Sequence, residues 1–99
     1  MGVFDHHATP AEQEAQYRTR RLQHEANENY RAAKKATLAA SIDCMATEDL
    51  SRLKAMHEEI GRIPTRYDNV SCRDYLVDLC MIIQAIVAMR IKQVEAQTK

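Results

Sequence analysis

The chain has 99 residues, 45% of them hydrophobic and 28% charged, so it is long enough for one domain and too short for two. Fourteen Lys and Arg residues balance fourteen Asp and Glu residues, and this neutral balance argues against nucleic acid or an anionic membrane surface as the partner. Only two Gly and two Pro are present, which leaves few turns for a β-sheet. The composition therefore predicts an all-α protein.

The N-terminus carries no basic segment followed by an apolar run, so we expect no secretory signal and a cytoplasmic protein. We predict a disordered N-terminus over residues 1–8 and a single helical domain over 9–99. The longest uncharged stretch, Leu79 to Met89, is about half of the roughly 20 residues that a spanning helix needs, so no membrane span is expected.

The first helix has a clear start signal in Thr9-Pro10-Ala11-Glu12, where Thr9 is the expected N-cap and Glu12 completes a capping box. No Gly or Pro follows until Gly61, and the next start signal is Thr47 ahead of two acidic residues. We therefore predict a long N-terminal helix over about 10–45.

A short helix over about 48–60 should follow, since apolar residues recur there at helical spacing and Gly61 and Pro64 are stop signals. After a loop over 61–69, Asn69 or Ser71 is the expected cap of a long apolar C-terminal helix over about 70–96. Cys72 and Cys80 would then lie two turns apart on this helix, too far to bridge, and we interpret the three cysteines as reduced, small apolar residues.

One face of the first helix is a narrow stripe of small residues, which predicts close packing of an antiparallel or self-paired helix: Leu22, Ala26, Tyr30, Ala33, Thr37, Ala40 and Cys44. The N-terminal half is too polar to be buried and should project from the bundle. The third helix carries more apolar surface than the other two can cover. We therefore predict a helical bundle completed by homo-oligomerisation.

Catalytic and metal sites are not expected in this chain. His24 and Glu28 lie one helical turn apart, but two ligands do not make a metal site. The chain has no Gly-rich phosphate loop, and no third group would orient a Cys–His pair for catalysis. We expect no enzyme activity and no cofactor.

The opposite face of the first helix is the feature with ligand character. Arg20, Arg31, Lys34 and Lys35 could pair with phosphate oxygens, and Tyr17 could stack on a base; an ordinary solvated face is the alternative. Arg66, in the loop after Pro64, is a second candidate for holding an anion or for capping helix carbonyls.

The segment Pro64-Thr65-Arg66 and the apolar helix that follows, with Leu76, Met81 and Gln84-Ala85-Ile86, resemble the helical-hairpin domain of phage proteins that sponge cyclic oligonucleotide signals in anti-phage defence, including anti-CBASS and anti-Thoeris sponges. The resemblance covers about a quarter of the chain. It implies a phage-encoded symmetric oligomer that binds nucleotides between protomers without hydrolysis, with Arg66 as a ligand contact.

Two functions follow from these patterns. The first is an oligomeric anti-defence protein that sequesters a phosphate-bearing signal such as a cyclic oligonucleotide, bound by Tyr17, the four basic residues of the first helix and Arg66. The alternative is a protein-binding inhibitor or adaptor, similar to an anti-CRISPR, that docks a helix face on a partner complex. A DNA-binding helix-turn-helix is disfavoured by the loop over 61–69 and by the neutral charge.

Overall fold

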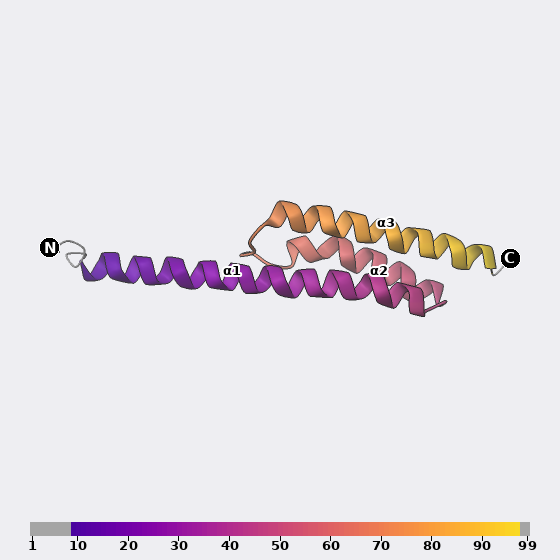
Figure 1. Cartoon of the computed structure of the whole chain (residues 1–99), viewed down its shortest axis with the longest axis horizontal. Helices are drawn as coiled ribbons and strands as arrows, with labels where there is room; N and C mark the ends of the chain where they lie inside the picture. The colour runs from indigo at the N-terminus through magenta and orange to yellow at the C-terminus, as the bar shows by residue number, and fades with distance from the viewer. Residues whose placement is uncertain (1–8, 98–99) are drawn as a thin grey trace.

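The computed structural model describes residues 9–97, which form three helices: α1 (Pro10–Asp43), α2 (Leu50–Arg62) and α3 (Arg73–Gln97) (Figure 1). Single 3-10 turns follow α1 at Cys44–Ala46 and α2 at Ile63–Thr65. The all-α prediction is confirmed, with helix ends within about three residues of those expected. The predicted disordered segment, 1–8, lies outside the described residues.

Two of the three predicted N-caps need correction. The cap of α1 is Thr9 as expected, because its Oγ1 accepts the Glu12 N–H at 3.1 Å. The cap of α2 is Asp49, not Thr47: the Asp49 carboxylate accepts the Arg52 N–H at 3.3 Å, and Thr47 instead accepts the N–H of Asp49. The start signal was therefore real, but the helix begins two residues later.

Asn69 and Ser71 do not cap α3. This helix begins at Arg73, after Cys72 adopts a positive φ of 53°. The prediction that Cys72 lies on the helix is therefore wrong. The two expected caps instead bind α1: Asn69 Nδ2 donates to the Leu22 carbonyl at 2.8 Å, and the Ser71 N–H donates to the Ala26 carbonyl at 3.0 Å. The loop before α3 is therefore fastened to the middle of α1.

Gly61 does not end α2, which continues through it to Arg62. Its missing side chain lets α3 approach closely, since a Cβ at this position would lie 2.5 Å from Gln84 Nε2. From this place Gln84 donates a hydrogen bond of 2.9 Å to the His57 carbonyl. The glycine therefore serves the contact between helices rather than the end of one.

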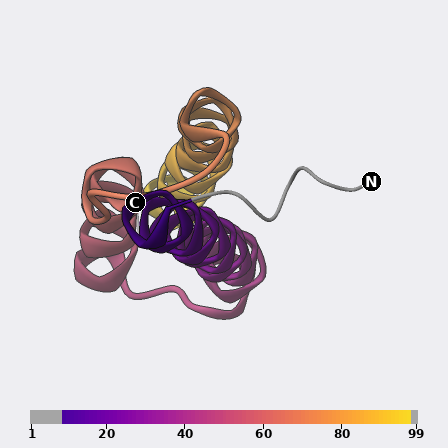
Figure 2. The same ribbon diagram turned by 90° about the vertical axis from the view of Figure 1, so that its left-hand side faces the viewer.

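The core lies where the small-residue stripe of α1 meets the other two helices. Ala26, Ala33, Thr37 and Cys44 of the stripe are buried, as predicted, and Ala33 and Cys44 pack with Leu53, Ile60 and Val87 among others. Leu22, the first residue of the predicted stripe, is instead 44% exposed, because it precedes the part of α1 that the other two helices cover. The antiparallel neighbour that the stripe predicts is α2, whereas α3 packs on α1 in the other direction. Contacts of Thr37 with Cys80 and of Cys44 with Arg90 advance along both helices together, so α3 packs parallel to α1, with α2 antiparallel to both (Figures 1 and 2).

The molecule is a rod of 77 × 20 × 18 Å with a radius of gyration of 20.6 Å, against about 13 Å for a compact chain of this length. Its length comes from α1, because residues 9–25 are all exposed and extend past the three-helix body. We call residues 10–25 the arm. Its projection from the bundle agrees with the prediction.

Candidate interaction surfaces

The arm carries the first of the predicted ligand residues. Tyr17 is 69% exposed, and Arg20 and His24 are exposed on the same side of α1. An ion pair of 3.8 Å between Arg18 and Glu14 lies on another side of the helix. Tyr17 and Arg20 are therefore open to a partner along a helix that no other described element covers.

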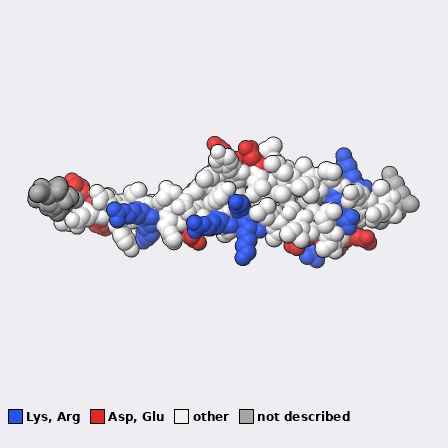
Figure 3. All heavy atoms as spheres, in the orientation of Figure 1, with Lys and Arg blue, Asp and Glu red and all other residues white. Residues whose placement is uncertain are grey.

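Arg31, Lys34 and Lys35 form a basic cluster where α1 joins the body. All three are exposed, and basic side chains gather on α1 in the space-filling view (Figure 3). Arg31 forms an ion pair of 2.6 Å with Glu28, whereas the two lysines form no ion pair with another described residue. The cluster thus presents two adjacent lysine ammonium groups that are available to a ligand.

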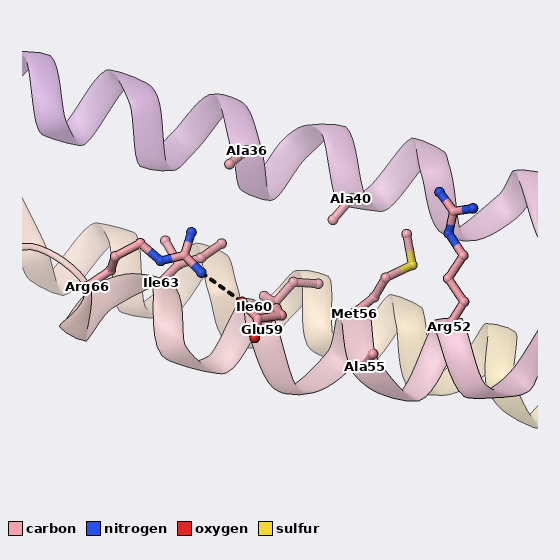
Figure 4. A pocket seen from close by; sticks show the side chains of 9 residues that line it. All are labelled: Ala36, Ala40, Arg52, Ala55, Met56, Glu59, Ile60, Ile63 and Arg66. Atoms are coloured by element: carbon pink, nitrogen blue, oxygen red, sulfur yellow. Dashed lines mark hydrogen bonds and ion pairs between the residues drawn. The ribbon is translucent and has the colours of Figure 1, made fainter.

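Arg66 lies apart from this cluster, at a groove between α1 and α2 (Figure 4). Its guanidinium donates to Glu59 at 2.8 Å, and the same carboxylate accepts from Arg62 at 3.2 Å, so Arg66 already has an ion-pair partner within the chain. The groove has a volume of about 330 Å³ and is lined by Ala36 and Ala40 of α1 and by mostly apolar residues of α2. The two alanines lie on the side of α1 opposite the basic cluster.

The six predicted ligand residues therefore do not meet in one pocket of a single protomer. Tyr17 and Lys35 are 18 residues apart on one helix, or about 27 Å at the standard rise. Arg66 faces a different side of the molecule. One small nucleotide could contact the arm, the cluster or Arg66, but not all three on one chain.

Apolar side chains remain exposed along α3 and at the end of α1, as expected from the excess of apolar surface on α3. On α3 they are Tyr75, Met81, Ile82, Ile86 and Met89; on α1 and the 3-10 turn after it they are Leu38, Ile42 and Met45. The face in view over α3 shows few charged side chains along most of the helix (Figure 3). Exposed apolar surface of this extent is typical of an interface between proteins.

The cysteines are all free, as the sequence suggests. Burial raises the pKa of the Cys44 thiol above its ordinary value, an effect that Arg90 partly opposes, and burial likewise raises the pKa of Cys80. Cys72 is exposed. Among residues 9–97, no group of three His, Cys, Asp or Glu side chains is placed to bind a metal ion.

Two arginines that the sequence analysis did not identify donate hydrogen bonds to backbone carbonyls in the segments that follow α1 and α2. Arg90 donates from Nε to the Cys44 carbonyl and from an Nη to the Thr47 carbonyl, both at 3.1 Å, which satisfies the end of α1. Arg73 donates to the carbonyls of Pro64, Tyr67 and Asp68. The one sequence signal for Arg90 was a cation on an otherwise apolar side of α3.

Comparisons of the chain with protein-family models, with curated proteins and with solved structures found no match. No described helix combines the length and the apolar character needed to cross a lipid bilayer.

Proposed function

We propose that this protein is a non-catalytic interaction protein that presents α1 to a partner protein. The observation that carries this proposal is the arm: sixteen residues of continuous helix, all exposed, that extend past the body. Only the last turn of the arm touches the rest of the chain, through hydrogen bonds of Leu22, Gln23 and Glu25 with the loop before α3, and its side chains before this turn bury no described residue. An exposed helix of this kind can bind in a groove on the surface of a partner protein.

One side of α1, which runs from the arm into the basic cluster, favours an acidic partner surface. Tyr17, Arg20 and Arg31 share one side of α1, and Tyr and Arg are the residue types that most often dominate the free energy of protein–protein binding. Opposite charge on the partner would also speed association and make it salt-dependent. This is the adaptor or inhibitor function that the sequence left as an alternative.

The test is partner capture by matched charge-reversal variants of the full chain. We expect the Arg20→Glu, Arg31→Glu double variant to lose at least about tenfold in affinity for the partner, because two carboxylates would replace two cations opposite an acidic surface and would be repelled by it. The Arg18→Glu, Lys54→Glu double variant changes net charge equally at exposed positions away from the side of α1 that carries Tyr17 and Arg20, and it should bind like the parent. Equal loss in both variants would contradict the proposal, since the effect would then follow net charge alone.

A second candidate function is capture of a phosphate-bearing nucleotide, and the cluster of Arg31, Lys34 and Lys35 favours it. Lys34 and Lys35 are free of ion pairs with described residues, and such groups bind phosphate oxygens well. Titration calorimetry with cyclic di- and trinucleotides tests this function. Heat that disappears in the Lys34→Glu, Lys35→Glu variant would support it, and absence of heat with the parent protein would exclude it for these ligands.

A further inference from the structure

Five apolar residues on one side of α3 follow a heptad spacing. Tyr75, Leu79, Ile82, Ile86 and Met89 are separated by alternate steps of four and three residues, the spacing of a coiled-coil seam. We call these five residues the seam. Leu79 is half-buried and the other four are exposed, because the buried residues of α3, such as Leu76, Ile83 and Val87, lie on the adjoining side of the helix, which faces α1 and α2.

The neighbouring part of α1 widens this apolar surface. Thr37 contacts Cys80, and the Cys44 carbonyl accepts from Arg90, which fixes the register of α1 against α3. Leu38 and Met45 follow Thr37 and Cys44 by one residue each and are 41% and 57% exposed, so by helical spacing they lie beside the contact. The seam thus borders further apolar side chains rather than a charged rim on that side.

We infer that a second copy of this chain covers the seam, with the two α3 helices antiparallel and their twofold axis beside Gln84 and Ala85. The spacing is self-complementary in that arrangement. Ile82 would face the partner's Ile86, and Leu79 would face the partner's Met89. The small side chain of Ala85 would let the two helices approach closely at the axis.

The charges beside the seam favour this direction over a parallel one. Asp78 directly precedes Leu79 of the seam, and Lys92 directly precedes the position that would continue the heptad spacing after Met89. The two charged residues lie seven residues on either side of Ala85. Both are exposed, and neither forms an ion pair with another described residue of its own chain. In the antiparallel pair, Asp78 of each chain would face the partner's Lys92, which gives two equivalent ion pairs. A parallel pair would instead place like charges opposite each other.

The test begins with the mass of the full chain by sedimentation equilibrium over a wide range of concentrations. We expect an equilibrium between 11.4 kDa and twice this mass. Ile82→Glu should weaken dimerisation more than about 100-fold, because each dimer would bury two unpaired carboxylates. Met81→Glu is the matched control: Met81 is 62% exposed against 58% for Ile82, yet it lies outside the seam, so this variant should dimerise like the parent.

Charge exchange tests the direction of the pair. Asp78→Lys and Lys92→Asp should each weaken the dimer severalfold, and the double variant should regain the parent's affinity because the pairs are restored with opposite polarity. A parent chain that stays at 11.4 kDa, or equal dissociation by Met81→Glu and Ile82→Glu, would overturn the inference. No rescue in the double variant would overturn the antiparallel register. Circular dichroism of each variant separates loss of helix from loss of the dimer.

Discussion

Arg90 is the residue that ties the corner between α1 and α2 to α3. Its guanidinium donates to the carbonyls of Cys44 and Thr47, which have no helical partner beyond the end of α1. A charged donor in this place offsets the cost of leaving two carbonyls unsatisfied next to the buried Cys44.

We therefore expect Arg90→Met to lower the free energy of unfolding by about 1.5–3 kcal/mol, the usual contribution of hydrogen bonds from a charged group. Urea denaturation at a fixed protein concentration measures this change. Lys54→Met removes a charge from an exposed position of α2 and should change stability by less than about 0.5 kcal/mol. A loss as small for Arg90 as for Lys54 would mean that water replaces the guanidinium at these carbonyls.

Gly61 and Gln84 form a coupled pair between α2 and α3. Gly61→Ala alone should be nearly neutral, because the gain of about 1 kcal/mol in helix propensity is offset by loss of the hydrogen bond from Gln84 to His57. In a Gln84→Ala background the clash is gone, so the same substitution should stabilise by about 0.5–1 kcal/mol. A double-mutant cycle by urea denaturation measures the coupling, and additive effects would contradict this explanation.

At the scale of the element, α1 consists of two parts with different sources of stability. Residues 26–43 pack their stripe against the core. The arm instead depends on helix propensity, its Thr9 cap, pairs such as Arg18–Glu14, and hydrogen bonds at its last turn to the loop before α3. Isolated helices of this length are marginal in water.

We expect hydrogen exchange to divide α1 accordingly. Amides of residues 14–25 should exchange orders of magnitude faster than those of residues 30–43, because opening the arm exposes no core. Amides of α3 around Val87 provide the slow reference. Uniform protection along α1 would show that another chain covers the arm in solution.

At the scale of the whole molecule, the inferred dimer would carry two arms that point in opposite directions. The twofold axis beside Ala85 lies level with residues near Ala40 of α1, given the contacts of Thr37 and Cys44. A bivalent protein of this shape could hold two partner molecules at its ends, which would raise its apparent affinity for a paired target.

Small-angle X-ray scattering tests this shape. Thirty residues of α1 lie between the axis and Pro10, about 45 Å on each side, so the dimer should reach about 90 Å from arm to arm. The single chain measures 77 Å, and a parallel dimer would keep nearly that length. A dimer whose longest dimension stays near the single-chain value would contradict the opposed arms.

The sequence by itself determined the features that depend on local chemistry and periodicity. Thr9 caps α1, Ala26, Ala33, Thr37 and Cys44 of the stripe are buried, the arm projects, and α3 keeps apolar side chains exposed, because caps and faces follow from residue type and a helical period of 3.6. The predicted ligand residues of α1 were placed on one side for the same reason. Only the tertiary structure decided that α3 runs parallel to α1, that Arg66 pairs with Glu59 away from the basic cluster, and that Arg90 and Asn69 bind backbone carbonyls of α1. These contacts join residues more than forty positions apart or fix the direction of a loop, and neither the period of a helix nor the spacing of a motif carries that information.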